Sequence, residues 1–238
     1  MDERITQRSG VSLGATTALV IVILAAANVA SNRVLPAALY VPWNAAIAVG
    51  LLVIVRRLVT DRELGLAEWW RGFRFGMVLF VATLAILLMG LAMPAVNDLF
   101  EDRRASGGAL TVIYQAIIRI PLGTVLLEEL AFRSVLPALV AKRHGVLRGS
   151  LAASALFGLW HVLPALNINQ VNPIARDLFG SGAGGKAVAV LFAVGSTMLA
   201  GLWLCLIRYR ARSVLAPFLA HVATNSIGYT IAWFVTRT

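Results

Sequence analysis

Apolar stretches alternate with short polar connections along the whole chain. Seven stretches stand out, and they cover residues 11–30, 43–59, 75–96, 120–140, 147–165, 187–207 and 214–235. An α-helix needs about 20 residues to cross the ~30 Å hydrocarbon core of a bilayer, and most of these stretches are close to that length. The pattern therefore predicts an all-α, polytopic transmembrane helical bundle of about seven spans. We expect residues 1–238 to form a single transmembrane domain.

Composition agrees with a membrane protein and excludes several soluble classes. The chain is 59% hydrophobic and only 13% charged, whereas soluble domains are about 45–50% apolar and about 25% charged. A net charge of +10 would suggest nucleic-acid binding in a soluble protein, but here the basic residues lie in the connections between apolar stretches. We therefore expect the lipid bilayer, and no nucleic acid, as a partner. The single cysteine, Cys205, excludes a disulfide framework and a cysteine-based metal site.

The basic residues also predict an orientation. With seven crossings, the amino-terminal segment and the second, fourth and sixth connections hold 13 Lys and Arg residues, and the opposite side holds 6. Short cytoplasmic connections are enriched in Lys and Arg. We therefore expect the amino terminus in the cytoplasm and the carboxyl terminus outside, in a bacterial or archaeal cell membrane.

Ionisable and amide side chains interrupt three of the last four apolar stretches. Buried charges are costly at membrane depth, so each needs a partner or a function. Counted at about 1.5 Å per residue from the predicted cytoplasmic ends, Glu128, His161 and Asn225 lie about 20–21 Å deep. His221 lies about 14 Å deep by the same count. Similar depths on separate helices predict one shared polar site.

The acidic pair in the fourth stretch has a spacing that favours an ion pair. Glu129 and Arg133 are four residues apart, with the acid first, which is the favourable order within a helix. Glu128 points about 100° away from Glu129 and is freer to face another helix. A satisfied structural ion pair and a hydrogen-bonded histidine are the plain alternative for any single helix, but three such helices together favour a functional site.

Three short motifs occur in order along these helices. They are Glu128-Glu129-x-x-x-Arg133, Phe157-x-x-x-His161 and His221-x-x-x-Asn225, the last preceded by Ser-Val-Leu-Ala-Pro-Phe-Leu-Ala at 213–220. Together they resemble the motifs of the CPBP family of intramembrane proteases. That family includes type II CAAX prenyl endopeptidases, the lysostaphin resistance protein A group and Abi-type bacterial proteins linked to bacteriocin self-immunity. The resemblance covers about residues 113–231, where we expect a CPBP-like catalytic core.

The resemblance implies an intramembrane endopeptidase whose polar cavity opens toward the cytoplasm. In that family pattern Glu128 activates water with the help of His161, while His221 and Asn225 stabilise the oxyanion. Supporting positions would be Glu129, Arg133 and Phe157; we expect Phe157 and Trp160 to serve as packing residues and cavity walls. The expected partner is a peptide or protein substrate, lipidated or membrane-embedded. The alternative is a non-catalytic membrane scaffold, or a bacteriocin self-immunity factor, that retains the fold.

Whether a cofactor takes part is left open by the residues. Glu128, His161 and His221 form a set that can bind zinc with an open fourth position. Against this, each of the three histidines is followed by glycine or valine, so the chain contains no His-Glu-x-x-His pair. The residues therefore give no firm prediction of a cofactor. We favour a reaction without metal, and zinc is the alternative.

Overall fold

The computed structural model describes residues 12–93, 100–102 and 104–237, and these residues form helices joined by turns, without strands. The predicted all-helical fold is therefore confirmed. The first half contains α1 (Leu13–Val29), α2 (Tyr40–Val55), the short α3 (Asp61–Leu64) and α4 (Trp69–Leu91). The second half contains α5 (Ala109–Tyr114), α6 (Leu126–Glu129), α7 (Leu136–Trp160), α8 (Val162–Ala165), α9 (Ile168–Val171), α10 (Pro173–Phe179), α11 (Ala183–Ala211), α12 (Leu215–Val222) and α13 (Gly228–Val235).

Five helices in the described part of the chain are long and apolar enough to cross a membrane. They are Leu13–Val34, Ala37–Val55, Asp61–Leu91, Ala109–Ala165 and Ala183–Ala211. The chain is thus a multi-pass integral membrane protein. The fourth of these helices has 57 residues and takes up two of the predicted stretches. The last predicted stretch, which carries His221 and Asn225, is helical but is not among the five.

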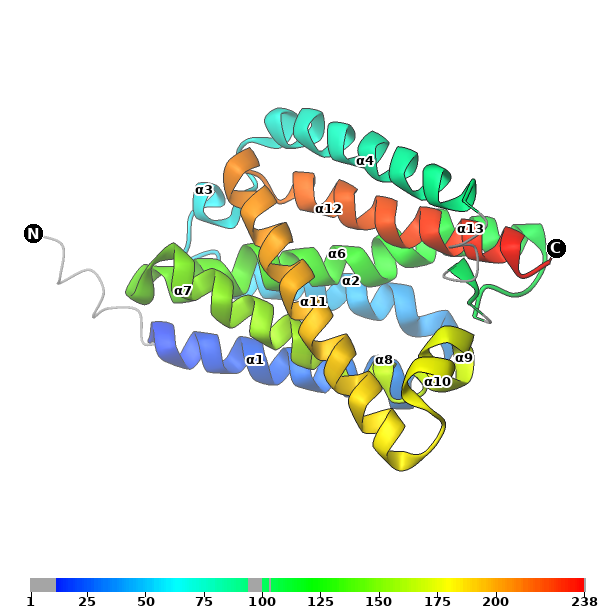
Figure 1. Ribbon diagram of the computed structural model, residues 1–238. Helices are drawn as coiled ribbons and strands as arrows, with labels where there is room; N and C mark the ends of the chain where they lie inside the picture. Colours follow the sequence, from blue (N-terminus) through cyan, green and yellow to red (C-terminus); the bar gives the residue numbers. More distant parts are fainter. Residues whose placement is uncertain (1–11, 94–99, 103, 238) are drawn as a thin grey trace, which may run out of the picture.

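The 57-residue stretch reverses direction at Gly145. This glycine has φ 79° and ψ 163° inside α7, a backbone conformation that strains residues with a side chain. In Figure 1 the chain accordingly doubles back within α7, near the start of α1. Before the turn, α5, α6 and the first part of α7 are joined into one path by π-helical segments at Gln115–Val125 and Leu130–Val135.

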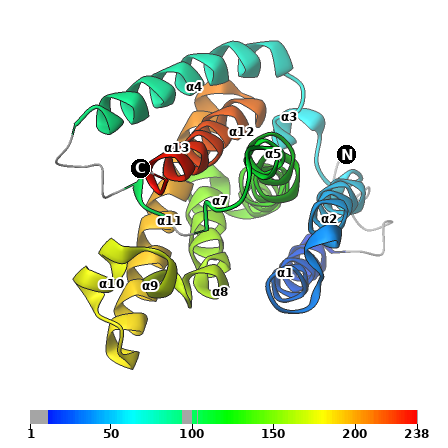
Figure 2. The ribbon, with the colours of Figure 1, turned by 90° about the vertical axis from the view of Figure 1, so that its right-hand side faces the viewer.

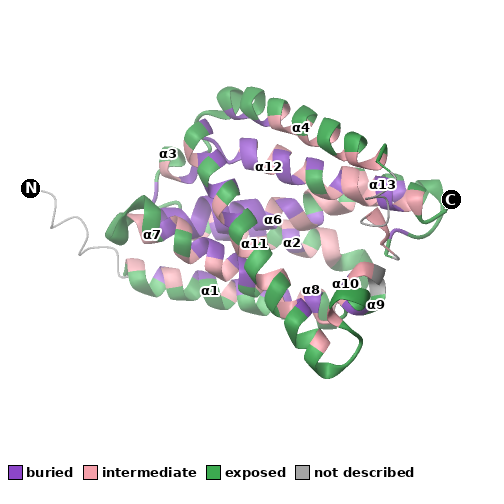
Figure 3. Cartoon of the chain, viewed as in Figure 1, coloured by how far each residue is buried: buried purple, intermediate pink, exposed green. Residues whose placement is uncertain are grey.

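The helices pack into a bundle with its polar positions near the middle. α11 packs along α7, α12 packs along α4, and α2 packs on the Gln115–Val125 segment. Viewed from the end of the bundle, α4 lies across α12 and α13, while α1 and α2 lie together on another side (Figure 2). Buried residues concentrate on α6, α7 and α12, and the outer turns of α4 and α11 are exposed (Figure 3). Exposed apolar side chains such as Val78 and Ile86 on α4 are what a lipid-facing surface requires.

Two glycines allow α4 to lie close to α12. A Cβ atom at Gly72 would lie 2.2 Å from Ser213 Oγ, and one at Gly76 would lie 2.8 Å from Leu219 Cδ1. These glycines are four residues apart and therefore share one face of α4. Small residues at this spacing let membrane helices approach closely. This contact helps to hold α12, which carries His221, against the rest of the bundle.

Candidate active site

The two adjacent glutamates lie at the centre of the bundle. Glu128 and Glu129 end α6 and expose only 4% and 1% of their surface. π-helical segments precede and follow α6, and such local widening of a helix is frequent at functional sites. The prediction that these carboxylates are buried on a helix is confirmed.

Glu129 forms the ion pair that its spacing predicts. Its Oε1 atom lies 3.3 Å from NH1 of Arg133, a residue with no exposed surface. The guanidinium carbon of Arg133 also lies 3.9 Å from the centre of the Phe157 ring. A buried carboxylate next to a buried cation is far less costly than either charge alone. The Phe157 ring supports Arg133 from the side that faces α7.

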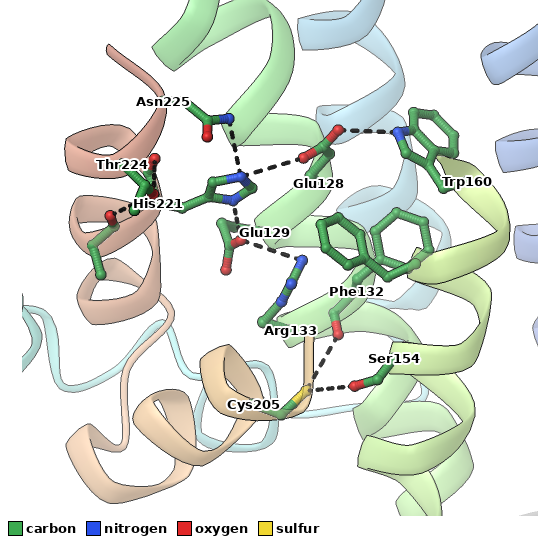
Figure 4. Close-up of polar contacts among 12 residues, drawn as sticks. Glu128, Glu129, Phe132, Arg133, Ser154, Trp160, Cys205, His221, Thr224 and Asn225 are labelled. Atoms are coloured by element: carbon green, nitrogen blue, oxygen red, sulfur yellow. Dashed lines mark hydrogen bonds and ion pairs between the residues drawn. The ribbon is translucent and has the colours of Figure 1, made fainter. Parts of the chain in front are cut away.

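His221 connects both glutamates to Asn225. Its Nδ1 atom lies 2.7 Å from Glu129 Oε1, and its Nε2 atom lies 3.7 Å from Glu128 Oε2. The Asn225 amide nitrogen lies 3.2 Å from the same Nε2 atom. His221 is on α12, and Asn225 follows one helical turn later in the π-helical segment Ala223–Ile227. Figure 4 shows these side chains pointing toward one another from two different helices. We call Glu128, Glu129, Arg133, His221 and Asn225 the polar cluster.

Trp160 makes a contact that the sequence reasoning missed. Its indole Nε1–H donates to Glu128 Oε1 over 3.0 Å, so Glu128 lies between Trp160 and His221 (Figure 4). The Trp160 carbonyl in turn accepts a hydrogen bond of 3.0 Å from the Asn28 amide on α1. Trp160 is therefore more than a cavity wall, because it fixes one oxygen of Glu128. A buried indole N–H needs an acceptor, and that requirement was the only signal in the sequence.

His161 stands beside the polar cluster rather than within it. Its Nδ1 atom lies 2.8 Å from the Phe157 carbonyl oxygen, one turn earlier in the chain. Its ring centre lies 4.6 Å from that of Phe157, whose ring centre is 6.2 Å from that of His221. Among the described residues, no hydrogen bond joins His161 to Glu128. The two imidazoles are thus close to the same aromatic ring, but only His221 contacts the carboxylates.

The histidines and acids that the structure describes do not form a metal-binding group. In residues 12–93, 100–102 and 104–237, no three His, Cys, Asp or Glu side chains are grouped so that they could hold a metal ion. The set Glu128, His161 and His221 is therefore not assembled as zinc ligands. The donor atoms of His221 face Glu129 and Asn225 instead.

A cavity of about 500 Å³ adjoins the polar cluster. Asn225 lines it, as do Thr124, Arg119 and Tyr229. Residues 100–102 and 104 and residues of α13 also line it, so the cavity lies toward the end of the bundle where α13 ends (Figure 1). That end is opposite to the Gly145 turn.

Comparison with known proteins identifies the family. A family model described as type II CAAX prenyl endopeptidase Rce1-like matches residues 110–227. No curated protein and no solved structure matches the chain. The matched range contains the three motifs and the whole polar cluster, and it confirms the resemblance to CPBP proteases. The chain therefore belongs, through residues 110–227, to the Rce1-like family of type II CAAX prenyl endopeptidases.

Proposed function

We propose that this chain is a CAAX-protease-like intramembrane endopeptidase in which Glu128 activates the water that attacks the peptide bond. The observation that carries this proposal is the polar cluster itself. Two buried carboxylates, an imidazole and a carboxamide meet at the centre of a membrane bundle, and Asn225 among them lines a cavity that lies toward one end. A bundle that served only as a scaffold would have no need for such costly buried groups.

Glu128 has the arrangement that a general base requires. Its Oε1 atom is held by Trp160, while its Oε2 atom has no hydrogen-bond partner among the described residues. That free oxygen can accept a proton from water. The water oxygen would attack the carbonyl carbon, and protonated Glu128 would return the proton to the departing amine nitrogen.

His221 and Asn225 would stabilise the negative charge on the tetrahedral intermediate. When His221 donates its Nδ1–H to Glu129, its Nε2 atom is the acceptor for the Asn225 amide. Glu129 and Arg133 then fix the ring orientation without contacting substrate. Donors that are already positioned before the reaction stabilise an oxyanion strongly where water is scarce. We propose that one N–H of the Asn225 amide stays on His221 Nε2 while its second N–H donates to the oxyanion, so that His221 positions the donor.

His161 would act from the edge of the site. It is half-buried, and its Nδ1 atom is engaged by the Phe157 carbonyl. The opposite ring nitrogen is therefore the atom that could contact water or substrate. We propose that His161 assists Glu128 through the attacking water, because no direct contact joins the two side chains.

We further propose seven crossings with the amino terminus in the cytoplasm, on the basis of the charge distribution in the connections. This orientation conflicts with the expectation, implied by the family resemblance, that the cavity opens to the cytoplasm. The cavity lies at the α13 end of the bundle, and the charge distribution assigns that end to the outside. One of the two expectations must therefore give way.

The proposal is tested with purified protein in detergent and a panel of lipidated and unlipidated peptides. We expect wild type to cleave at least one peptide at an internal bond, detected by mass spectrometry of both fragments. We expect a chelator to leave the rate unchanged. Loss of cleavage with chelator and its recovery with added zinc would show that the reaction depends on a metal ion. The absence of cleavage across the whole panel would contradict the proposal.

A further inference from the structure

The end of the bundle opposite the cavity beside the polar cluster contains a basic hollow that the proposed reaction does not use. Two adjoining cavities, of about 430 and 400 Å³, share Arg62 and Arg208 in their walls. Arg212 lines the larger cavity and Lys142 lines the smaller one. These residues come from α3, the carboxyl end of α11 and α7, at the end of the bundle where α7 turns back at Gly145 (Figure 1). We call Arg62, Arg208 and Arg212 the arginine cluster.

Arg208 is buried but only partly satisfied. It exposes 4% of its surface, and its NH2 atom donates to the backbone carbonyl oxygen of Glu63. Its Nε atom is buried without a hydrogen-bond partner in the described residues. The turn after α3 holds the side chain in place, since a Cβ atom at Gly65 would lie 3.1 Å from that Nε atom. A guanidinium carries five N–H donors and is costly to bury, so the remaining donors of Arg208 need an acceptor.

No carboxylate in the described part of the chain forms an ion pair with the arginine cluster. The Glu63 carboxylate is already engaged, with Oε1 lying 2.9 Å from Lys142 Nζ and Oε2 accepting from the Thr60 backbone N–H over 2.7 Å. Glu68 also lines the larger cavity, but it is exposed. The wall of that cavity thus carries three arginines against one exposed carboxylate. This excess of positive charge favours an anion as the ligand.

The arginine cluster lies at the level where lipid headgroups meet the bundle. Arg208 is in the last turn of α11, one of the five helices that can cross a membrane. Trp69 and Trp70, which begin α4 beside α3, expose 62% and 55% of their surface. Exposed tryptophans are enriched at membrane–water interfaces. Basic pockets between membrane helices at this level bind the phosphate of anionic lipids.

We propose that the arginine cluster binds the phosphate group of an anionic phospholipid, with Arg208 as the innermost donor. Guanidinium groups bind phosphate oxygens through paired N–H donors, which favours arginine at such a site. Arg62 and Arg212 are exposed and would contact the same headgroup from α3 and from the connection between α11 and α12. The lipid would thereby link the turn after α3 to the start of α12. This inference does not rest on the protease proposal, because the site contains no residue of the polar cluster.

Native mass spectrometry of the full chain measures this binding directly. The protein is purified in a neutral detergent and titrated with phosphatidylglycerol or with phosphatidylcholine of the same acyl chains. Both lipids contain a phosphodiester, but the choline cation of the second offsets its charge. We expect phosphatidylglycerol to bind wild type at least about tenfold more tightly, because charge-assisted hydrogen bonds are the strong ones. Arg208→Gln should bring the ratio of the two affinities close to one.

A second variant carries the test if Arg208→Gln does not fold. It combines Arg62→Gln with Arg212→Asn, which changes only exposed side chains. Arg212 has φ 55°, and asparagine tolerates this left-handed conformation. The matched control combines Arg56→Gln with Arg57→Gln. It also removes two exposed arginines, from the connection between α2 and α3, but neither of them lines the two cavities. We expect the first pair of changes to abolish the preference for phosphatidylglycerol and the control pair to keep it.

Three results would overturn the inference. They are equal affinity of wild type for the two lipids, a preference that survives in the variants of the arginine cluster, and a preference that the control pair loses to the same extent. Inorganic phosphate then distinguishes a lipid from a soluble anion. Added in excess, it should leave most of the phosphatidylglycerol bound, whereas complete displacement would assign the site to soluble phosphate and refute the lipid.

Discussion

At the scale of single residues, the site depends on side chains that hold other side chains. Glu128 is fixed by Trp160 on one oxygen, and His221 is fixed by Glu129 on one nitrogen. The i, i+4 spacings within each helix made Glu129–Arg133 and His221–Asn225 predictable. The Trp160–Glu128 contact joins residues 32 positions apart on different helices. It depends on how those helices are rotated, which a single sequence does not specify.

Replacing Trp160 with Phe tests this positioning. The change keeps an aromatic ring and removes the N–H group that binds Glu128 Oε1. A hydrogen bond to a charged group contributes about 1.5–3 kcal/mol, so we expect kcat to fall by roughly 10–100-fold. KM should change little, because Trp160 orients the base rather than the substrate.

Trp43→Phe is the matched control for this experiment. The Trp43 indole nitrogen is buried and has no hydrogen-bond partner in the described residues. Its removal should therefore leave kcat unchanged. Equal kcat values for Trp160→Phe and wild type, measured under the same conditions, would show that Trp160 only fills space.

At the scale of elements, the sequence predicted helices better than it predicted their ends and contacts. The apolar stretches became helices, and the fourth and fifth are the two arms of one 57-residue helical range that reverses at Gly145 within α7. Residues 100–102 contribute to the cavity wall, yet a short polar connection gives no sequence signal for that position. The close contact between α4 and α12 was likewise not predicted from the sequence, since it depends on which helix the glycine-bearing face of α4 packs against.

Gly72→Ala tests the α4–α12 contact. The added Cβ atom would lie 2.2 Å from Ser213 Oγ, so the helices must separate. Overpacking of this kind costs about 1–3 kcal/mol, and we expect a lower thermal midpoint in detergent. Gly50→Ala on α2 is the control, because nothing lies within 4 Å of its Cβ position. That change should leave the thermal midpoint unchanged or raise it, since alanine favours the helical conformation more than glycine does. A similar midpoint in both variants would mean that α4 does not need this close approach.

At the scale of the whole molecule, the orientation in the membrane decides which side substrates come from. The charge distribution predicts that the Gly145 turn faces the cytoplasm and the cavity faces outward. The test is labelling of His144→Cys and Glu101→Cys with an impermeant maleimide; the native Cys205 is buried. In right-side-out vesicles we expect Glu101→Cys to react and His144→Cys to stay unlabelled. The reverse pattern would refute the predicted orientation and place the cavity toward the cytoplasm.

The account as a whole depends on Glu128 being the group that activates water. The most direct measurement is the initial rate of peptide cleavage by Glu128→Gln, compared with Glu68→Gln, which removes an exposed carboxylate at the start of α4, outside the polar cluster. General-base catalysis contributes about 10²–10⁴-fold, so we expect a loss of at least about 100-fold in Glu128→Gln and no loss in Glu68→Gln. A Glu128→Gln protein that is folded and cleaves at the wild-type rate would contradict the proposed mechanism.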